Sequence, residues 1–147
     1  MIVLKTNREL ALMREACIIS AGALKLAGEA VEPGVTTAEI DKIAYDYIIK
    51  CGAKPNFLNY NGYPATACIS INDEVIHGIP SKKRVIEEGD IVSIDLGAVL
   101  EGFNGDNAAT FAAGAISSEA KRLCDTTKES LFLGIEKAVA GGRIGDI

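Results

Sequence analysis

The sequence predicts an α+β domain in which helices cover an antiparallel sheet. Apolar residues recur at steps of three and four before Cys51, as on an amphipathic helix, and then alternate with polar residues from Ala53 to about Phe111, as in strands. Another helical period follows Ser117. Helices that come before and after one block of strands favour an α+β domain over a doubly wound one, in which helices and strands would alternate along the chain.

The two N-terminal helices share one start signal. Thr6–Glu9 and Thr36–Glu39 are capping boxes in form, in which the Thr oxygen accepts a backbone N–H and the Glu carboxylate reaches back to the Thr. Glu32-Pro33-Gly34 is expected to end the first helix. Gly52 follows the second helix at the position where left-handed backbone is common, so we expect that helix to end there.

Turn signals divide the alternating block into strands. They are the pairs Asn61-Gly62, Asn72-Asp73 and Glu88-Gly89. Ser117 or Ser118 is expected to open a third helix, which Gly141-Gly142 would stop. Asp146 resembles the N-cap of a further element, although no helical sequence follows it.

Composition excludes several classes of protein. The 147 residues fit one domain with a hydrophobic core, and no apolar run among them is long enough to span a bilayer. The N-terminus lacks the pattern of a signal peptide. A net charge of −5 without a basic run argues against nucleic acid as a partner. The four cysteines are widely spaced, which indicates reduced thiols, and we expect a cytoplasmic protein with no membrane partner.

Two aspartates interrupt the apolar strands near their shared turn. Asp95 and Asp106 are eleven residues apart in a stretch that otherwise reads as a hairpin. A turn centred on Leu100-Glu101 would place them directly opposite each other, with Cβ atoms roughly 4.5–5.5 Å apart. Carboxylates this close repel each other unless a proton or a cation lies between them, so the pair predicts a divalent metal site. The alternative is structural: one aspartate caps a turn and the other forms an ion pair.

Alternation predicts which residues share the face of the two aspartates. This face is small and polar, and it would include Ser93, Gly97, Ala108 and Thr110. The opposite face is apolar and suits a core: Val92, Ile94, Leu96, Ala109 and Phe111. The prediction depends on the turn. Gly102 could instead close a three-residue loop with a bulge, and a shift of one residue would turn one carboxylate away from the other.

The single histidine lies downstream of an unusual aromatic segment. His77 ends the run Val75-Ile76-His77 before Gly78, so we expect it at a strand end that ligands can reach. Its near-neutral pKa would let it donate a hydrogen bond to developing charge or relay a proton. The aromatic residues of Phe57–Tyr63 lie in a loop with Gly and Pro, where they would form a pocket or cover a sheet edge.

Five short motifs follow one another along the chain. They are Asn61-Gly-Tyr63-Pro, Cys68-Ile-Ser-Ile-Asn72, His77-Gly-Ile-Pro80, Gly89-Asp-Ile-Val-Ser-Ile-Asp95 and Gly102-Phe-Asn-Gly105-Asp106. In this order and spacing they strongly resemble the type I methionine aminopeptidases, and the resemblance extends over essentially the whole chain. It implies a pita-bread fold, of which this chain would be the N-terminal half, with antiparallel sheet and covering helices.

The resemblance also implies a centre of two divalent metal ions in the cleft of the fold. Asp95 would chelate one ion and Asp106 would bridge both. Cobalt, manganese, iron and zinc are the candidate metals, because carboxylate ligands alone do not select one of them. His77 would contact the substrate and stabilise the tetrahedral intermediate.

The implied reaction removes the N-terminal methionine of nascent proteins and peptides, through a hydroxide bound to two metal ions. The methionine side chain would lie in a pocket that is lined by Phe57, Tyr60, Tyr63, Cys68 and His77. An apolar, polarizable pocket suits a thioether. The expected partners are nascent polypeptides that begin with Met, with the ribosome as a further partner.

Two departures from the family pattern shape the expectation. Asn104 occupies a position where family members often have a His or another residue, and this departure is minor. The family's other ligands, a His and two Glu, belong to its C-terminal half, and no His follows Asp106 here. We therefore expect residues 1–147 to be the N-terminal part of one catalytic domain, inactive or nearly so alone. The alternative is a catalytically silent pita-bread relative that acts as a protein-binding module.

Overall fold

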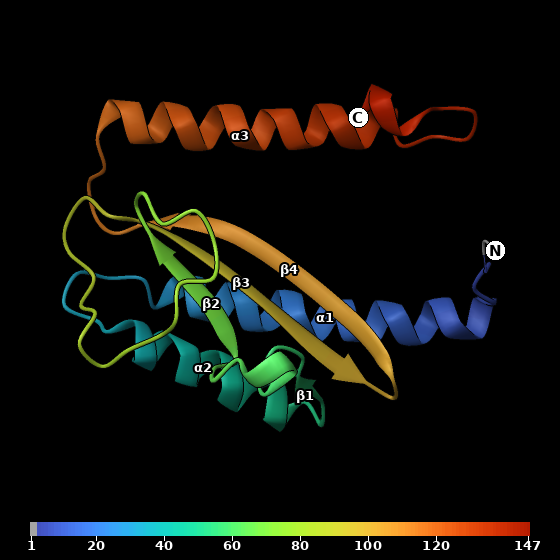
Figure 1. The fold of residues 1–147 in the computed structure, drawn as a ribbon, viewed down its shortest axis with the longest axis horizontal. Helices are drawn as coiled ribbons and strands as arrows, with labels where there is room; N and C mark the ends of the chain where they lie inside the picture. Colours follow the sequence, from blue (N-terminus) through green and yellow to red (C-terminus); the bar gives the residue numbers. More distant parts are fainter. Residues whose placement is uncertain (1–2) are drawn as a thin grey trace. The chain divides into compact units, whose positions relative to one another are not determined.

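The computed structural model describes residues 3–147, which form two compact units (Figure 1). The first unit ends at Ala115 and contains two helices and a four-stranded antiparallel sheet. The second unit begins at Ile116 and contains α3 (Ser118–Lys137) and a 3-10 turn (Ile144–Asp146). The elements follow the predicted order of helix, helix, strands and helix, which confirms an α+β class.

The helices α1 (Asn7–Glu29) and α2 (Thr37–Lys50) begin at the two predicted capping boxes. In α2 the Glu39 carboxylate accepts the Thr36 N–H at 2.8 Å, while the Thr36 hydroxyl accepts the Glu39 N–H at 3.3 Å. These bonds satisfy donors that a helix start otherwise leaves unpaired. Gly52 follows α2 with a φ of +76°, as its position predicted.

The sheet is built around β3 (Ile91–Leu100). Its neighbour β4 (Phe103–Ala112) pairs along the full length of one edge, while β2 (Ala67–Ile71) and the two-residue β1 (Lys54–Pro55) pair with successive parts of the other edge. All three pairings are antiparallel. Because successive side chains of a strand point to opposite faces, those of β3 alternate between the face that packs against α1 and α2 and the opposite face of the sheet.

The turn between β3 and β4 corrects the predicted register. Leu100 pairs with Phe103, so the loop consists of Glu101 and Gly102 rather than of Leu100 and Glu101. Both loop residues have positive φ, +48° and +83°, which is the pattern of a type I′ turn. The three-residue loop with a bulge does not occur. The register is therefore two residues away from the predicted one, and a shift of two keeps every side chain on its predicted face.

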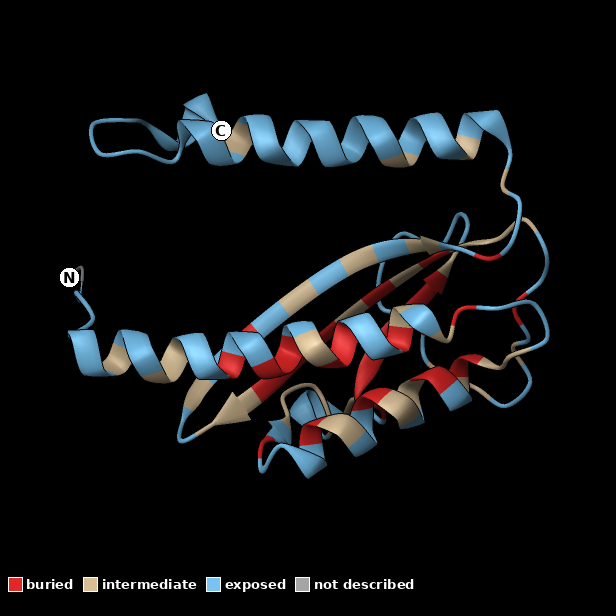
Figure 2. Cartoon of the chain, turned by 180° about the vertical axis from the view of Figure 1, so that it is seen from behind, coloured by how far each residue is buried: buried red, intermediate tan, exposed pale blue. Residues whose placement is uncertain are grey.

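The core lies between the sheet and the first two helices. Figure 2 shows buried positions along the sheet-facing side of α1 and α2 and along β2 and β3. The fully buried side chains include Ile40, Ile48, Ile69, Ile94 and Leu96. Burial of each such side chain contributes about 1.5–3 kcal/mol. The predicted apolar face of β3 is thus confirmed, and the opposite face is left free of core packing.

Two predictions about single segments are wrong. His77 does not end a strand: β2 ends at Ile71, and residues 72–80 form an irregular segment in which the apolar pair Val75-Ile76 is exposed. The helix α3 ends at Lys137, before Gly141-Gly142. The Asp146 carboxylate accepts the N–H of Arg143, and its expected role as the N-cap of a following element stays a prediction. None of the helices in residues 3–147 is long and apolar enough to cross a membrane.

Candidate functional site

The carboxylates of Asp95 and Asp106 lie on the same face of the β3–β4 hairpin. Asp95 pairs with Ala108 and Asp106 pairs with Gly97, so the two aspartates are diagonal neighbours and are not directly opposed. Diagonal neighbours on two paired strands are about 7–8 Å apart, and their side chains can extend toward each other across that distance. The prediction of a shared face is confirmed, while the prediction of direct opposition is wrong because the turn is displaced.

The environment of Asp95 disfavours its negative charge. Partial burial raises the pKa of Asp95, and the nearby Asp106 carboxylate raises it further by repulsion and by hydrogen bonding. His77 acts in the opposite direction, because a positive imidazole lowers this pKa. A bound cation would remove the repulsion between these two acidic groups. The arrangement therefore has the electrostatics of a cation-binding pair.

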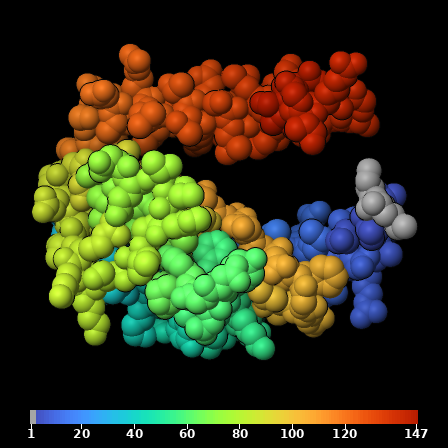
Figure 3. All heavy atoms as spheres, viewed as in Figure 1, coloured from blue at the N-terminus to red at the C-terminus, as the bar shows by residue number. Residues whose placement is uncertain are grey.

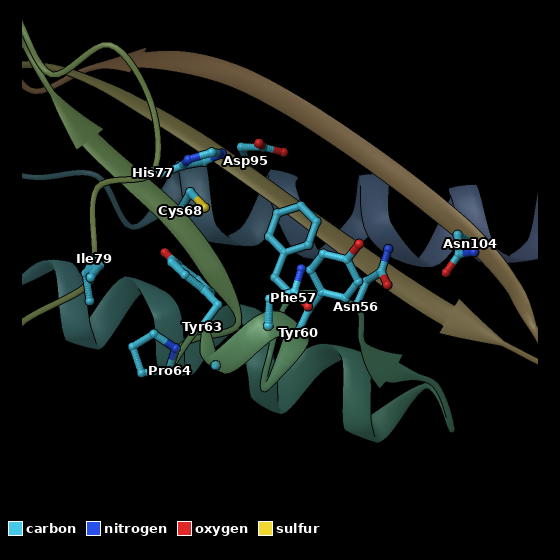
Figure 4. Close-up of a pocket in the computed structure, with 12 residues that line it drawn as sticks. Asn56, Phe57, Tyr60, Tyr63, Pro64, Cys68, His77, Ile79, Asp95 and Asn104 are labelled. Carbon is cyan, nitrogen blue, oxygen red and sulfur yellow. The ribbon is translucent and has the colours of Figure 1, made fainter.

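A pocket of about 790 Å³ opens beside Asp95 (Figure 4). Its walls come from the aromatic loop, from β2, from the irregular segment that follows β2, and from the hairpin. The residues that line it include Asn56, Phe57, Tyr60, Tyr63, Pro64, Cys68, His77, Ile79, Asp95 and Asn104. The structure thus brings together the predicted residues of the aromatic loop, Cys68, His77 and Asp95. Asp106 lies on the same face of the hairpin and is not among the lining residues.

Cys68 and Tyr63 form a neutral wall of this pocket. Cys68 is the direct ladder partner of Asp95, which places its side chain on the aspartate face. Burial raises the pKa of the Cys68 thiol, and the Asp95 and Asp106 carboxylates raise it further. Burial also raises the pKa of the Tyr63 phenol. Both groups are therefore uncharged at neutral pH and suit an apolar ligand group.

A carboxylate on α2 accepts hydrogen bonds from the backbone at the start of this wall and holds it in place. The Asp41 carboxylate accepts the N–H groups of Thr66 and Ala67 at 2.9 and 2.8 Å. Burial raises the pKa of Asp41, and these two hydrogen bonds partly offset the effect. Cys68 directly follows Ala67, so these hydrogen bonds to α2 also help to fix the position of the Cys68 backbone in the pocket wall.

His77 reaches the pocket from the irregular segment rather than from a strand. Its side chain is exposed and lies near Asp95 and Cys68 in the close-up (Figure 4). The Tyr63 hydroxyl donates to the Gly78 carbonyl at 3.3 Å, which joins the aromatic loop to this segment. Figure 3 shows the two segments next to each other on one face of the first unit. A ligand in the pocket would therefore meet the imidazole and the Asp95 carboxylate together.

Sequence reasoning did not assign Asn56, Ile79 or Asn104 to the pocket. Asn104 had a signal, since it lies two residues before Asp106 and must share its face. Asn56 and Ile79 had none, because their positions depend on how the irregular segments pack. No group of three His, Cys, Asp or Glu side chains in residues 3–147 is placed to hold one metal ion. Asp95 and Asp106 thus fit part of a metal site.

Comparison with known proteins agrees with this geometry. Residues 11–147 match the model of metallopeptidase family M24. A methionine aminopeptidase of Clostridium acetobutylicum is 54% identical over the whole chain, and methionine aminopeptidase 1 of Bacillus subtilis is 46% identical. The chain spans 59% of the length of each of these two relatives. These matches confirm the resemblance to the type I methionine aminopeptidases.

A solved structure confirms the fold. The crystal structure of methionine aminopeptidase from Thermotoga maritima superposes with a TM-score of 0.90 at 38% identity. The match covers 95% of this chain and 55% of that protein. The chain therefore has the antiparallel sheet and covering helices of a pita-bread fold, and it matches about half of that protein's length.

Proposed function

This chain belongs to metallopeptidase family M24, and we propose that it forms the N-terminal part of a methionine aminopeptidase active site. In this proposal the complete site hydrolyses the peptide bond that follows an N-terminal methionine of nascent proteins and peptides. One observation carries the proposal: Asp95 and Asp106 share a face beside a pocket whose walls are aromatic and sulfur-bearing. The similarity to methionine aminopeptidases over the full chain supports it. A cytoplasmic location and encounter with the ribosome are parts of the same proposal.

Asp95 and Asp106 are the proposed metal ligands in this part of the site. Their mutual repulsion raises the pKa of Asp95, and bound cations would remove that repulsion. Two carboxylates cannot fix two ions, and no group of three candidate ligands is placed together in residues 3–147, so we propose that the further ligands belong to another part of the protein. Two divalent ions bound there would polarise the peptide carbonyl and lower the pKa of water. We therefore expect the 147-residue chain alone to have little or no peptidase activity.

The pocket is the proposed binding site of the methionine side chain. Phe57, Tyr60 and Tyr63 offer aromatic surface, and the neutral Cys68 thiol adds a polarizable atom. A thioether gains about 0.3–1.5 kcal/mol from a contact with an aromatic ring. An acidic side chain would lose its hydration in the same pocket beside the Asp95 carboxylate, and the neutral thiol and Tyr63 phenol carry no opposite charge to pair with it. This difference favours methionine over acidic N-terminal residues.

His77 is the proposed catalytic group of this chain. Its imidazole lies beside Asp95 in the lining of the pocket, and we propose that the scissile carbonyl of a substrate whose methionine side chain is bound there lies next to it. A hydrogen bond from the imidazole would stabilise negative charge that develops on the substrate. Loss of one such donor typically lowers kcat by about 10²–10³-fold.

A chimera tests the proposal. Residues 1–147 would be continued by the remaining C-terminal segment of the Clostridium acetobutylicum relative, of which this chain spans 59%. We expect this chimera to release methionine from peptides in the presence of manganese or cobalt, and Asp106→Asn to abolish that activity. Glu101→Gln is the matched control, since it neutralises an exposed carboxylate in the turn of the same hairpin. A folded chimera that binds methionine peptides without cleaving them would favour the silent binding module instead.

A further inference from the structure

His77 has a backbone conformation that needs external support. Its φ is +61°, in the left-handed region that residues other than glycine rarely adopt. A residue with a side chain adopts this conformation at a cost of about 1–2 kcal/mol. His77 is also exposed and lies in an irregular segment, so no regular hydrogen-bond ladder holds it. Contacts made by its neighbours must therefore fix the direction in which the imidazole points.

Gly78, the next residue, is fixed at both of its backbone polar groups. Its N–H donates to the Ser70 hydroxyl at 3.1 Å, and its carbonyl accepts the Ile69 N–H at 2.8 Å. The Tyr63 hydroxyl donates to the same carbonyl. A Cβ at position 78 would lie 2.1 Å from the Ile69 carbonyl oxygen, so only glycine can approach β2 this closely. The Ser70 bond thereby holds the peptide plane that joins residues 77 and 78, and the bonds to the carbonyl hold the next plane, against the edge of β2.

Ser70 is well placed for this function and is not needed by the sheet. It is buried, with 4% of its surface exposed, and it lies on the aspartate face of β2 directly opposite Ser93. The Ser93 hydroxyl pairs instead with Thr110 on β4 at 2.8 Å. The two facing serines therefore form hydrogen bonds with different partners, and the Ser70 hydroxyl accepts the hydrogen bond from the Gly78 N–H.

Arg84 supports the same segment from the side of the sheet edge. Its guanidinium donates to the carbonyls of Ile69 and Ile79, each at 3.3 Å, and forms an ion pair with Glu74. The Glu74 carboxylate in turn accepts the Ile71 N–H at 2.9 Å. The segment between Ile71 and Ile79 is thus closed at its base, while Ser70 fixes it next to the histidine.

We propose that Ser70 is a positioning residue for His77, and that its hydroxyl acts through the Gly78 N–H to aim the imidazole at the Asp95 end of the pocket. This proposal deepens the role of His77 and rests on the proposed function for its catalytic meaning. How rigidly residues 77 and 78 are held can be measured in the 147-residue chain without any catalytic assay.

Nuclear magnetic resonance of the full 147-residue chain tests the positioning directly. In Ser70→Ala the buried Gly78 N–H loses its partner, so its amide exchange should accelerate by about tenfold or more. Cross-peaks between the His77 imidazole and Cys68 protons should weaken or vanish. Ser70→Thr keeps the hydroxyl and should restore both signals. Ser93→Ala removes the facing hydroxyl and should leave both signals as in the unmodified chain.

Amide exchange of Ile94 in the core separates local release from general unfolding. If Ser70→Ala also accelerates Ile94, the two amides are compared within that variant. A larger acceleration at Gly78 than at Ile94 supports the proposal, and an equal acceleration contradicts it. Unchanged Gly78 exchange and unchanged His77 cross-peaks in Ser70→Ala, or equal losses in Ser93→Ala, would overturn it.

Kinetics of the chimera connect the position of the imidazole to its use. Ser70→Ala should lower kcat by about tenfold with little change in KM, because the methionine pocket is lined by other residues while the donor to the developing charge is displaced. A rise of about tenfold in KM with constant kcat would contradict the positioning role. A chimera that is inactive without any substitution would count against the proposed function, while the resonance experiment would still decide the position of His77.

Discussion

At the scale of single residues, the aspartate pair is an unfavourable arrangement in the metal-free chain. The folded structure raises the pKa of Asp95, so the free energy of unfolding is larger below the ordinary Asp pKa of about 3.9 and decreases as pH rises through the raised value. Burial is the main cause and repulsion by Asp106 is the second. Residues retained at such a cost are typical of functional sites.

Asp106→Asn should therefore change stability and metal binding in opposite directions. Removing the repulsion should stabilise the metal-free chain at pH 7 by at most about 1 kcal/mol, because the pair is partly solvated. The same change should weaken manganese binding at least tenfold, since it removes a charged ligand. Urea unfolding with and without manganese measures both effects. A variant that is less stable without metal would indicate that Asp106 has a structural role.

Tyr63 combines two functions that substitution can separate. Its ring lines the pocket, and its hydroxyl bonds to the carbonyls of Ala67 and Gly78. Tyr63→Ala in the chimera should raise KM for methionine peptides about tenfold or more and leave metal affinity nearly unchanged, because Asp95 and Asp106 are untouched. Tyr63→Phe should keep most of the affinity for methionine. Equal loss of substrate and metal binding in Tyr63→Ala would show that the aromatic loop is structural.

At the scale of elements, the helix starts were predictable and the hairpin register was not. A capping box involves residues three apart, so Thr36 and Glu39 announce the start of α2 without tertiary information. The register of β3 and β4 depends on a turn in which Glu101 adopts positive φ, and Glu is not a residue that signals this conformation. The aspartates stayed on one face because the error was two residues, the period of a strand.

The capping boxes also differ in what their loss would expose. Thr36→Ala should destabilise the chain by about 1 kcal/mol, because the first turn of α2 anchors buried residues such as Ile40. Thr6→Ala should have a clearly smaller effect, since the first buried residue of α1 is Ala16 and its early turns can fray without opening the core. Thermal unfolding of both variants makes the comparison. Equal losses would show that α1 folds as one cooperative unit from its first turn.

This capping effect should depend on pH with a definite sign. Hydrogen bonds from the Thr36 hydroxyl and N–H lower the pKa of Glu39. A lowered pKa in the folded chain adds stability above the ordinary Glu pKa of about 4.3, and this stability is lost as pH falls through the lowered value. The difference between Thr36→Ala and the unmodified chain should therefore shrink in acid.

At the scale of the whole molecule, the sequence indicated the candidate site better than the path of the chain through it. Cys68 and Asp95 belong to strands, where alternation decides which face a side chain occupies. His77 was misplaced because the apolar pair Val75-Ile76 mimics a strand, although both residues are exposed in a segment that Gly78 and Arg84 hold against β2. Such a segment is fixed by tertiary contacts, which local patterns do not contain.

The described part of the chain contains two proposed metal ligands, Asp95 and Asp106, rather than a full set, and this determines how we expect it to bind ions. Isothermal titration of the 147-residue chain with manganese should give a dissociation constant on the order of 0.1–1 mM, because water must supply most of the ligands to each ion. Light scattering under the same conditions should show whether a second copy supplies further carboxylates, in which case affinity would rise with chain concentration. The chimera should bind the same ion far more tightly, and Asp106→Asn should reduce that affinity. Tight binding of two ions by the monomeric 147-residue chain would show that its own side chains rearrange into a complete site, so that no outside ligand is required.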